Sequence, residues 1–171
     1  MEKKLYLLAE PDDNLQTEFK VFEKIITGNG LTGDQTKDIP YHITLSSYSA
    51  ENEKYTADLL DKIKKEFSQV KISFSSLGLF GLNVLFFNPD MNRELIDIYN
   101  FTKEKSLNRE EDLAAHATLL IDKPDNIIKI LPEISGKFKK LEGKIRFISL
   151  YEFFPKRFIK RVELIESTCP S

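Results

Sequence analysis

Two short stretches of this sequence decide its interpretation: HITL at residues 42–45 and HATL at residues 116–119. Together they contain both histidines of the chain, and each histidine is followed two positions later by a threonine. The chain has 171 residues and nine threonines, so chance would produce this double spacing in about 0.3% of cases. We therefore interpret the two stretches as copies of one motif.

The residues of each motif alternate as they do in a β-strand. On a strand, side chains at positions i and i+2 project to the same side, about 6–7 Å apart. His42 therefore shares a face with Thr44, and His116 shares a face with Thr118. The apolar residue between them faces the opposite way, toward a core. Each motif thus predicts a strand that presents one imidazole and one hydroxyl on its polar face.

The rest of the chain repeats one order of elements around the two motifs. Apolar spacing and turn residues predict strands over residues 4–9, 41–48, 70–79, 83–87, 115–121, 144–154 and 158–165. They predict helices over residues 12–26, 50–67, 91–107 and 125–134, the last weakened by Pro132. Gly78 and Gly81 mark a tight turn, and residues 27–40 form a glycine-containing loop. Each half of the chain thus reads strand, helix, motif strand, helix, strand.

This repeat predicts the fold class α+β. We expect a single domain over residues 1–171, built from two similar strand-helix-strand-helix-strand lobes around a pseudo-twofold cleft. Helices between strands require crossover connections, so we also expect the motif strands to lie in mixed sheets flanked by helices. Two motif strands related by a twofold axis would face the same cleft.

The composition is typical of a globular protein that fills its own core. Apolar residues make up 41% and charged residues 30%, and thirteen phenylalanines supply ample surface to bury. No apolar run approaches the roughly 20 residues of a membrane-spanning helix, and the first residues lack the pattern of a signal peptide. The single cysteine, Cys169, cannot form an internal disulfide, so we expect a reducing, cytoplasmic compartment. A net charge of −2 argues against a protein that coats nucleic acid by bulk charge. We expect a monomer with no membrane partner.

A cleft lined by two histidines and two threonines suits phosphoester chemistry. Histidine gives and takes protons near neutral pH, so one imidazole can accept a proton from water while the other donates one to a leaving oxygen. Threonine hydroxyls can donate hydrogen bonds to the non-bridging oxygens of a phosphate. Two histidines with no carboxylate beside them are a thin ligand set for zinc or iron, so we expect no metal site and no cofactor.

At these residues the sequence resembles the two-histidine (2H) phosphoesterases, which include the 2′-5′ RNA ligases and the 2′,3′-cyclic phosphodiesterases. The resemblance covers nearly the whole chain: a first strand near the start, the paired motifs, and the stretch GLFGLNVLFFNP at residues 78–89 between them. It implies a bilobal α+β fold and a hydrolase that needs no metal ion. The partner that it implies is an RNA end or a small nucleotide carrying a 2′,3′-cyclic phosphate.

The resemblance also implies roles for the motif residues. His42 and His116 would be the catalytic residues, and Thr44 and Thr118 would bind the substrate. In the implied reaction, His116 activates water, His42 protonates the leaving 3′ oxygen, and the product carries a 2′-phosphate. Many RNA-acting relatives have an arginine soon after the second motif. Here the first basic residue after it is Lys123, which keeps a small nucleotide open as the substrate.

Weaker candidates lie outside the motifs. Tyr48 and Tyr151 are placed where they would bind substrate by stacking on a base. A cluster that we call the C-terminal basic cluster comprises Lys156, Arg157, Lys160 and Arg161, with Phe158 among them. It would either guide a phosphodiester strand toward the cleft or form a solvated strand edge whose charges prevent pairing.

Two alternative functions rest on the same residues. One is the reverse reaction, which joins a 2′,3′-cyclic end to a 5′ hydroxyl through a 2′-5′ bond, because a catalyst serves both directions. The other is a non-catalytic module that only binds a phosphate or an RNA end. Two symmetric proton carriers argue against the module, and a bell-shaped dependence of rate on pH would favour the enzyme.

Overall fold

The structure is a computed structural model that describes residues 2–34 and 38–168. Its strands are β1 (Lys4–Pro11), β2 (Ile43–Ser49), β3 (Val70–Phe80), β4 (Val84–Pro89), β5 (Ala117–Ile121), β6 (Leu141–Phe153) and β7 (Arg157–Glu163). Its helices are α1 (Asp13–Gly28), α2 (Glu53–Glu66), α3 (Arg93–Thr102) and α4 (Pro124–Lys137), with a short 3-10 helix, η1 (Ala50–Asn52), before α2. Cys169 lies outside the described residues. Within them, no helix is both long and apolar enough to cross a membrane.

The named strands of the described chain pair only in antiparallel fashion, in the order β1-β2-β5-β4-β3-β6-β7. β1 also pairs with β6, so the strands form a bent sheet that closes on itself. The expectation of mixed sheets is therefore wrong. After α1 and after α3, the chain re-enters the sheet beside the end of the strand that preceded the helix. The next strand therefore runs antiparallel to that strand. Ile43 thus pairs with Ala9, and Ala117 pairs with Phe87.

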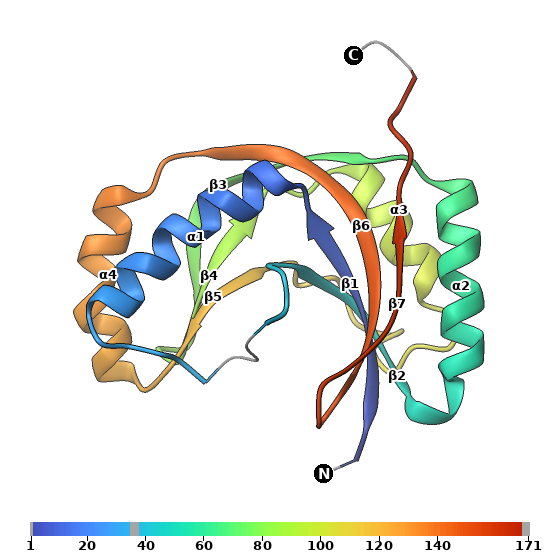
Figure 1. Cartoon of the computed structure of the whole chain (residues 1–171), viewed down its shortest axis with the longest axis horizontal. Coiled ribbons are helices and arrows are strands. Elements are labelled where there is room, and N and C mark those ends of the chain that lie inside the picture. Colours follow the sequence, from blue (N-terminus) through green and yellow to red (C-terminus); the bar gives the residue numbers. More distant parts are fainter. Residues whose placement is uncertain (1, 35–37, 169–171) are drawn as a thin grey trace.

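Two lobes share the long strand β6. Its first part, residues 141–145, pairs with β3, and its remaining part pairs with β1. One lobe consists of β7, β6, β1 and β2 and is covered by α2 and α3. The other consists of β6, β3, β4 and β5 and is covered by α1 and α4 (Figure 1). This bilobal α+β architecture confirms the predicted fold class.

Each lobe combines elements from both halves of the chain. α1 belongs to the first half but packs against α4 and β5, whereas α3 belongs to the second half but packs against α2 and β2. The third strand of each half is exchanged in the same way. β3 of the first half pairs with β4 of the second, and β6 of the second half pairs with β1 of the first. The exchange is reciprocal, as a pseudo-twofold relation requires, and it ties the two halves of the chain together.

Helix α1 begins at a cap that also binds the sheet. The Asp12 carboxylate accepts hydrogen bonds from the backbone N–H of Leu15 (3.0 Å) and from that of Lys144 in β6 (2.9 Å). Leu15 then packs closely on β6 at Gly143, where an added Cβ would come within 2.6 Å of its side chain. The buried residues of α1 are those of its predicted apolar face: Leu15, Phe19, Phe22 and Ile26.

Two details differ from the sequence prediction. α3 ends at Thr102 and not at Leu107, because the chain then runs beside β2, where the Leu107 N–H donates to the Ser47 carbonyl (2.8 Å). Gly78 lies inside β3 and not in the turn. The turn is formed by residues 81–83, with Gly81 at a φ of 56°, a backbone conformation that favours glycine.

Candidate active site

The two motifs meet where β2 lies beside β5. These strands pair at Ile43 and Ala117, in antiparallel sense, and both side chains are buried in the core. Neighbouring residues on a strand face opposite ways, so the residues one position before and after this pair face the other side of the sheet. That side is the cleft between the lobes.

The antiparallel sense places each histidine beside the threonine of the other motif. Counting one residue from the Ile43–Ala117 pair, His42 faces Thr118 and Thr44 faces His116. Each of these side chains is partly buried. The structure therefore brings together the four residues that the sequence analysis singled out, with the two histidines at opposite corners. We call this arrangement the four-residue site.

A β-bulge follows the threonine in both motif strands. The pairing of β2 with β1 uses Thr44 and then Ser46, skipping Leu45. The pairing of β5 with β4 skips Leu119 in the same way. A bulge adds one residue to a strand, so the alternation of its side chains reverses beyond it. Up to the threonine, the even-numbered residues of each motif strand face the cleft; beyond the bulge, the odd-numbered residues do.

This reversal makes the substrate-binding prediction for Tyr48 wrong. Counted from His42 and Thr44, Tyr48 would face the cleft, but beyond the bulge it faces the helix layer. Its side chain is 0% exposed, and its hydroxyl donates to the Thr102 carbonyl at the end of α3 (2.5 Å). Burial raises the pKa of the Tyr48 hydroxyl. Tyr48 is a core residue that anchors α3.

Tyr151 does not offer a free ring face to a base either. It is 8% exposed, and its ring lies parallel to that of Phe153 at 6.1 Å between centroids. The edge of Phe158 approaches it at 5.4 Å. The stacking role predicted for Tyr151 therefore conflicts with its packing, and the more exposed aromatic residues of the hairpin are Phe154 and Phe158.

Both histidines make the same hydrogen bond. Nδ1 of His42 lies 2.8 Å from the Pro40 carbonyl, and Nδ1 of His116 lies 2.7 Å from the Ala114 carbonyl. A carbonyl oxygen only accepts, so Nδ1 carries a proton and donates in both cases. The other ring nitrogen, Nε2, is then the atom that can accept or release a proton toward the cleft. This arrangement suits general acid–base work in both motifs.

The environment of His42 favours its neutral form. Burial lowers the pKa of His42 below its ordinary value of 6.5, since a charged imidazolium loses solvation there. The hydrogen bond to Pro40 opposes this shift, and the charge of His116 adds to it. The two imidazoles are therefore close enough to influence each other electrostatically.

His116 is held by two phenylalanines that the sequence analysis did not assign to the site. The Phe80 ring meets the His116 ring edge-on at 4.8 Å between centroids, and the Phe86 ring lies at 5.4 Å. Both belong to the β3–β4 hairpin, which corresponds to the GLFGLNVLFFNP stretch. The sequence signal was present in that stretch, but only strand pairing places it beside the second motif.

The backbone before His42 is held by α1. The Gln16 side-chain amide donates to the Tyr41 carbonyl (2.7 Å), and its oxygen accepts from the Tyr41 N–H (2.9 Å). The Tyr41 hydroxyl donates to the carboxylate of Glu23 (3.3 Å), which lies about two helical turns after Gln16 in α1. These contacts fix the entry to the first motif. A glutamine on a helix surface carries no sequence signal for such a role.

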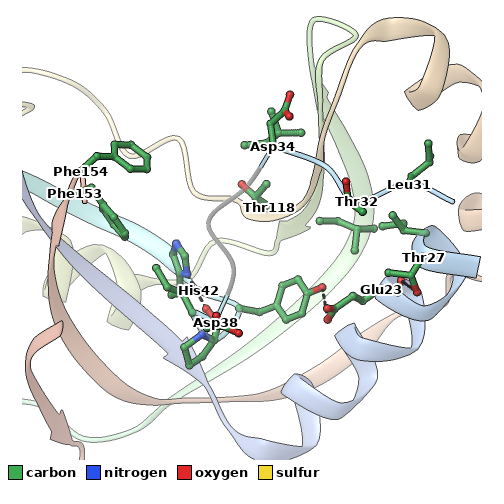
Figure 2. A pocket seen from close by; sticks show the side chains of 16 residues that line it. Glu23, Thr27, Leu31, Thr32, Asp34, Asp38, His42, Thr118, Phe153 and Phe154 are labelled. Atoms are coloured by element: carbon green, nitrogen blue, oxygen red, sulfur yellow. Dashed lines mark hydrogen bonds between the residues drawn. The ribbon is translucent and has the colours of Figure 1, made fainter. Parts of the chain in front are cut away.

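A cavity of about 530 Å³ opens beside His42 and Thr118 (Figure 2). Phe153 and Phe154 lie on one side of His42, and Glu23 of α1 lies on the other. The described residues that line this cavity include three with carboxylates, and no lysine or arginine: Glu23, Asp34 and Asp38. The described lining of the cavity, on the α1 side of the site, is therefore acidic.

The C-terminal basic cluster does not form one patch. The Arg157 guanidinium pairs with the carboxylates of Glu53 (2.5 Å) and Glu152 (3.1 Å). Lys160 pairs with Asp61 of α2 (2.7 Å), on the helix side of the sheet. The next residue, Arg161, faces the opposite side, toward the cleft. Strand alternation therefore separates cations that are adjacent in the sequence.

Within the described residues, no group of three or more His, Cys, Asp or Glu side chains is arranged to hold a metal ion. No family model matches the sequence, and no curated protein matches it either. Solved structures do match it over almost the whole chain.

The ligand-free crystal structure of E. coli LigT matches at 16% identity and a TM-score of 0.63, over 97% of this chain and 100% of LigT. A crystal structure described as a phosphoesterase matches at 17% identity and a TM-score of 0.61, over 97% of this chain and 100% of that one. E. coli LigT complexed with 3′-AMP matches at 16% identity and a TM-score of 0.59, over 96% of this chain and 99% of that one. At these identities the likeness establishes the fold. The chain therefore has the LigT-like fold, which is the bilobal fold that the resemblance to the 2H phosphoesterases implied.

Proposed function

We propose that this protein is a phosphoesterase that opens the 2′,3′-cyclic phosphate of RNA ends or nucleotides to a 2′-phosphate, without a metal ion or cofactor. The observation that carries this proposal is the four-residue site. Its two histidines lie at opposite corners, and each has its Nε2 available for proton transfer. The fold shared with LigT and a phosphoesterase supports it, as do LigT complexes with 3′-AMP, NADP+, ATP and phosphate.

In the proposed reaction, a water oxygen attacks the phosphorus atom of the cyclic phosphate. Nε2 of His116 accepts the proton that the water loses. The bond between phosphorus and the 3′ oxygen breaks, and Nε2–H of His42 donates its proton to that oxygen. The 2′ oxygen keeps the phosphate. One water molecule is consumed, and each histidine ends in the protonation state with which the other began.

The threonines hold the phosphate while its charge changes. Thr44 and Thr118 each project a hydroxyl from the cleft face of a motif strand, beside the histidine of the other motif. These hydroxyls would donate to the two non-bridging oxygens, where negative charge increases in the transition state. A donor held in place before the reaction costs no reorganisation during it.

The role of His42 as the acid requires its protonated form, although burial lowers its pKa in the free protein. An anionic phosphate bound beside His42 raises the pKa of His42, because it stabilises the charged imidazolium. Substrate binding therefore favours protonation of His42, whereas the empty site favours its neutral imidazole.

The decisive experiment incubates the protein with a nucleoside 2′,3′-cyclic phosphate and with a short RNA that ends in one, and resolves the 2′- and 3′-phosphate products. We expect a 2′-phosphate, and at least a roughly 100-fold lower rate in His42→Ala and in His116→Ala, since general acid–base groups contribute roughly 10²–10⁴. Undiminished turnover in either variant would remove the proposed roles.

Two additions to the same experiment separate the alternatives. EDTA should leave the rate unchanged, and a clear loss would point to a metal-dependent reaction. An added RNA with a 5′ hydroxyl should yield a joined product if the protein also works as a ligase. Tight binding of the cyclic phosphate without product at any pH would favour the non-catalytic module.

A further inference from the structure

One cation of the C-terminal basic cluster lies on the same face as the four-residue site. Across the sheet, Thr44 pairs with Leu8, Leu8 pairs with Ser149, and Ser149 pairs with Arg161. Directly paired residues project to the same side of a sheet, so Arg161 shares the cleft face with Thr44. Its neighbour Lys160 faces α2 on the other side.

A buried carboxylate holds this arginine in place. Nη2 of Arg161 lies 2.6 Å from Oε2 of Glu10, which is on β1 and 0% exposed. The Ser149 hydroxyl donates to the other oxygen of Glu10. The guanidinium carbon lies 3.6 Å from the centroid of the Phe147 ring on β6. A buried carboxylate is costly unless it is paired, so Glu10 and Arg161 hold each other in one position.

The guanidinium keeps donors for a ligand. Within the described residues, Glu10 is the one polar partner of Arg161, and a guanidinium has five N–H donors. It lies over β6, which is about two strand spacings, roughly 10 Å, from β2. This is too far to reach the phosphate between the histidines, but it suits a second phosphate farther along a strand. Phe158, which is 56% exposed, precedes Arg161 on β7 and offers a ring for a base.

The charge on the two sides of the four-residue site favours one direction. On the α1 side, the cavity lining carries Glu23, Asp34 and Asp38 and no lysine or arginine among its described residues. These described carboxylates disfavour a polyanion, and Lys156 reaches this side at the Asp38 carbonyl, to which its Nζ donates (3.5 Å). On the β6–β7 side, Arg161 provides a fixed positive group beside exposed aromatic rings, the combination that binds single-stranded nucleic acid.

We propose that an RNA strand leaves the four-residue site across β1 and β6 toward β7, and that Arg161 binds the phosphate next to the reacting one. This inference rests on the proposed function and deepens it, because it makes an RNA end, and not a mononucleotide, the preferred substrate. Glu10 and Phe147 are positioning residues that hold the guanidinium.

The test compares two substrates in four proteins: the unaltered protein and three variants. We expect the kcat/KM for a trinucleotide ending in a 2′,3′-cyclic phosphate to exceed that for the matching mononucleotide by about tenfold or more. In Arg161→Gln this ratio should fall by about tenfold, and in Arg161→Lys it should recover in part, because the charge remains. Lys160→Gln is the matched control, since it removes the same charge from the opposite face, and its ratio should equal that of the unaltered protein.

Binding separates this inference from the proposed function. The affinity of a labelled trinucleotide for the His116→Ala protein is measured against salt concentration, with and without Arg161→Gln. We expect weaker binding and a salt slope that is smaller by about one when Arg161 is replaced. If the protein turns over both substrates and Arg161→Gln leaves the ratio of their kcat/KM values unchanged, the strand path is overturned and the phosphoesterase stands. If the protein shows no turnover but Arg161→Gln still weakens trinucleotide binding, the phosphoesterase is overturned and the strand path stands. If Arg161→Gln unfolds the protein, the test uses the kcat/KM ratio of Arg161→Lys. A ratio below that of the unaltered protein supports the strand path, and an equal ratio overturns it.

Discussion

His42 and His116 make the same backbone hydrogen bond but lie in different surroundings. His42 follows a segment that α1 holds through Gln16, and it borders the acidic cavity. His116 lies against the rings of Phe80 and Phe86. A near-symmetric pair is thus placed in an asymmetric setting, and in the proposed reaction this asymmetry would let one imidazole act as the acid and the other as the base.

The titration of His42 follows from this setting. In the free protein, burial and the charge of His116 lower the pKa of His42 below 6.5, and bound phosphate should raise it. The chain has two histidines, so their ring resonances can be followed by NMR, with His116→Gln used for assignment. We expect the His42 resonance to titrate below pH 6.5 without ligand and at higher pH with inorganic phosphate. An unchanged pH midpoint of the His42 titration with phosphate bound would contradict the proposal that substrate binding favours the protonated form of His42.

The threonines should affect catalysis and not stability. Thr44→Val and Thr118→Val each remove a hydroxyl donor but keep the β-branched shape that suits a strand. We expect kcat/KM to fall by roughly 10–100-fold in each, since hydrogen bonds to charged groups contribute about 1.5–3 kcal/mol, while the melting temperature stays within a few degrees. Thr17→Val, at an exposed position of α1, is the control and should leave both quantities unchanged.

At the scale of elements, the β3–β4 hairpin supports the second motif. Gly78 pairs with Phe86 across the hairpin, and a Cβ at Gly78 would lie 2.3 Å from the Phe86 ring. The absence of a side chain at Gly78 lets this ring lie over the backbone and reach His116. The glycine inside this strand thus has a packing reason, and through Phe86 it supports the four-residue site.

Gly78→Ala should therefore reduce activity without contact with substrate. The added methyl group displaces the Phe86 ring, and His116 loses its orientation, so we expect kcat to fall by about tenfold to a hundredfold. Gly136→Ala in α4 is the control, because nothing lies within 4 Å of its added Cβ. Steady-state kinetics and far-UV circular dichroism measure both effects. Equal kcat values for the two variants would show that Phe86 does not position His116.

The bulges in β2 and β5 show where a pattern along the strand stops being reliable. Up to Thr44 and Thr118, simple alternation predicts the correct face. Beyond Leu45 and Leu119 it predicts the wrong one, so it places Tyr48 in the cleft although Tyr48 is buried in the core. A bulge is defined by two residues that oppose one residue of the partner strand, so it cannot be seen in the sequence of one strand alone.

At the scale of the whole molecule, the exchange of elements between the lobes couples the core to the site. Phe19 of α1 is buried against Phe87 of β4, with their rings stacked at 4.5 Å, and meets the Tyr41 ring edge-on at 5.2 Å. Tyr41 directly precedes His42. The helix of one half thus packs on the strands of the other and supports the first motif.

Phe19→Ala should destabilise the whole protein. Removal of this 0% exposed ring leaves a cavity among aromatic neighbours, so we expect a loss of about 3–5 kcal/mol in the free energy of unfolding. For a chain of this length, that corresponds to a fall of about 6–20 °C in melting temperature. Val21→Ala, on the exposed side of the same helix, should change the free energy of unfolding by about 0.5 kcal/mol or less. A similar melting temperature for both variants would contradict this account of the core.

Local pattern in the sequence was sufficient for the paired motifs, for the helices and strands within a few residues, for the α+β class and for the four residues of the proposed site. These features depend on side-chain alternation and on apolar spacing, which act over a few neighbouring positions. The tertiary structure alone decided that the sheet is antiparallel, that α1 and α3 change lobes, and that His42 lies beside Thr118. It also buried Tyr48, separated Lys160 from Arg161, and brought Phe86 to His116 and Glu10 to Arg161. Each of these outcomes depends on which strands pair and in what register, and pairing is set by contacts between residues far apart in the chain.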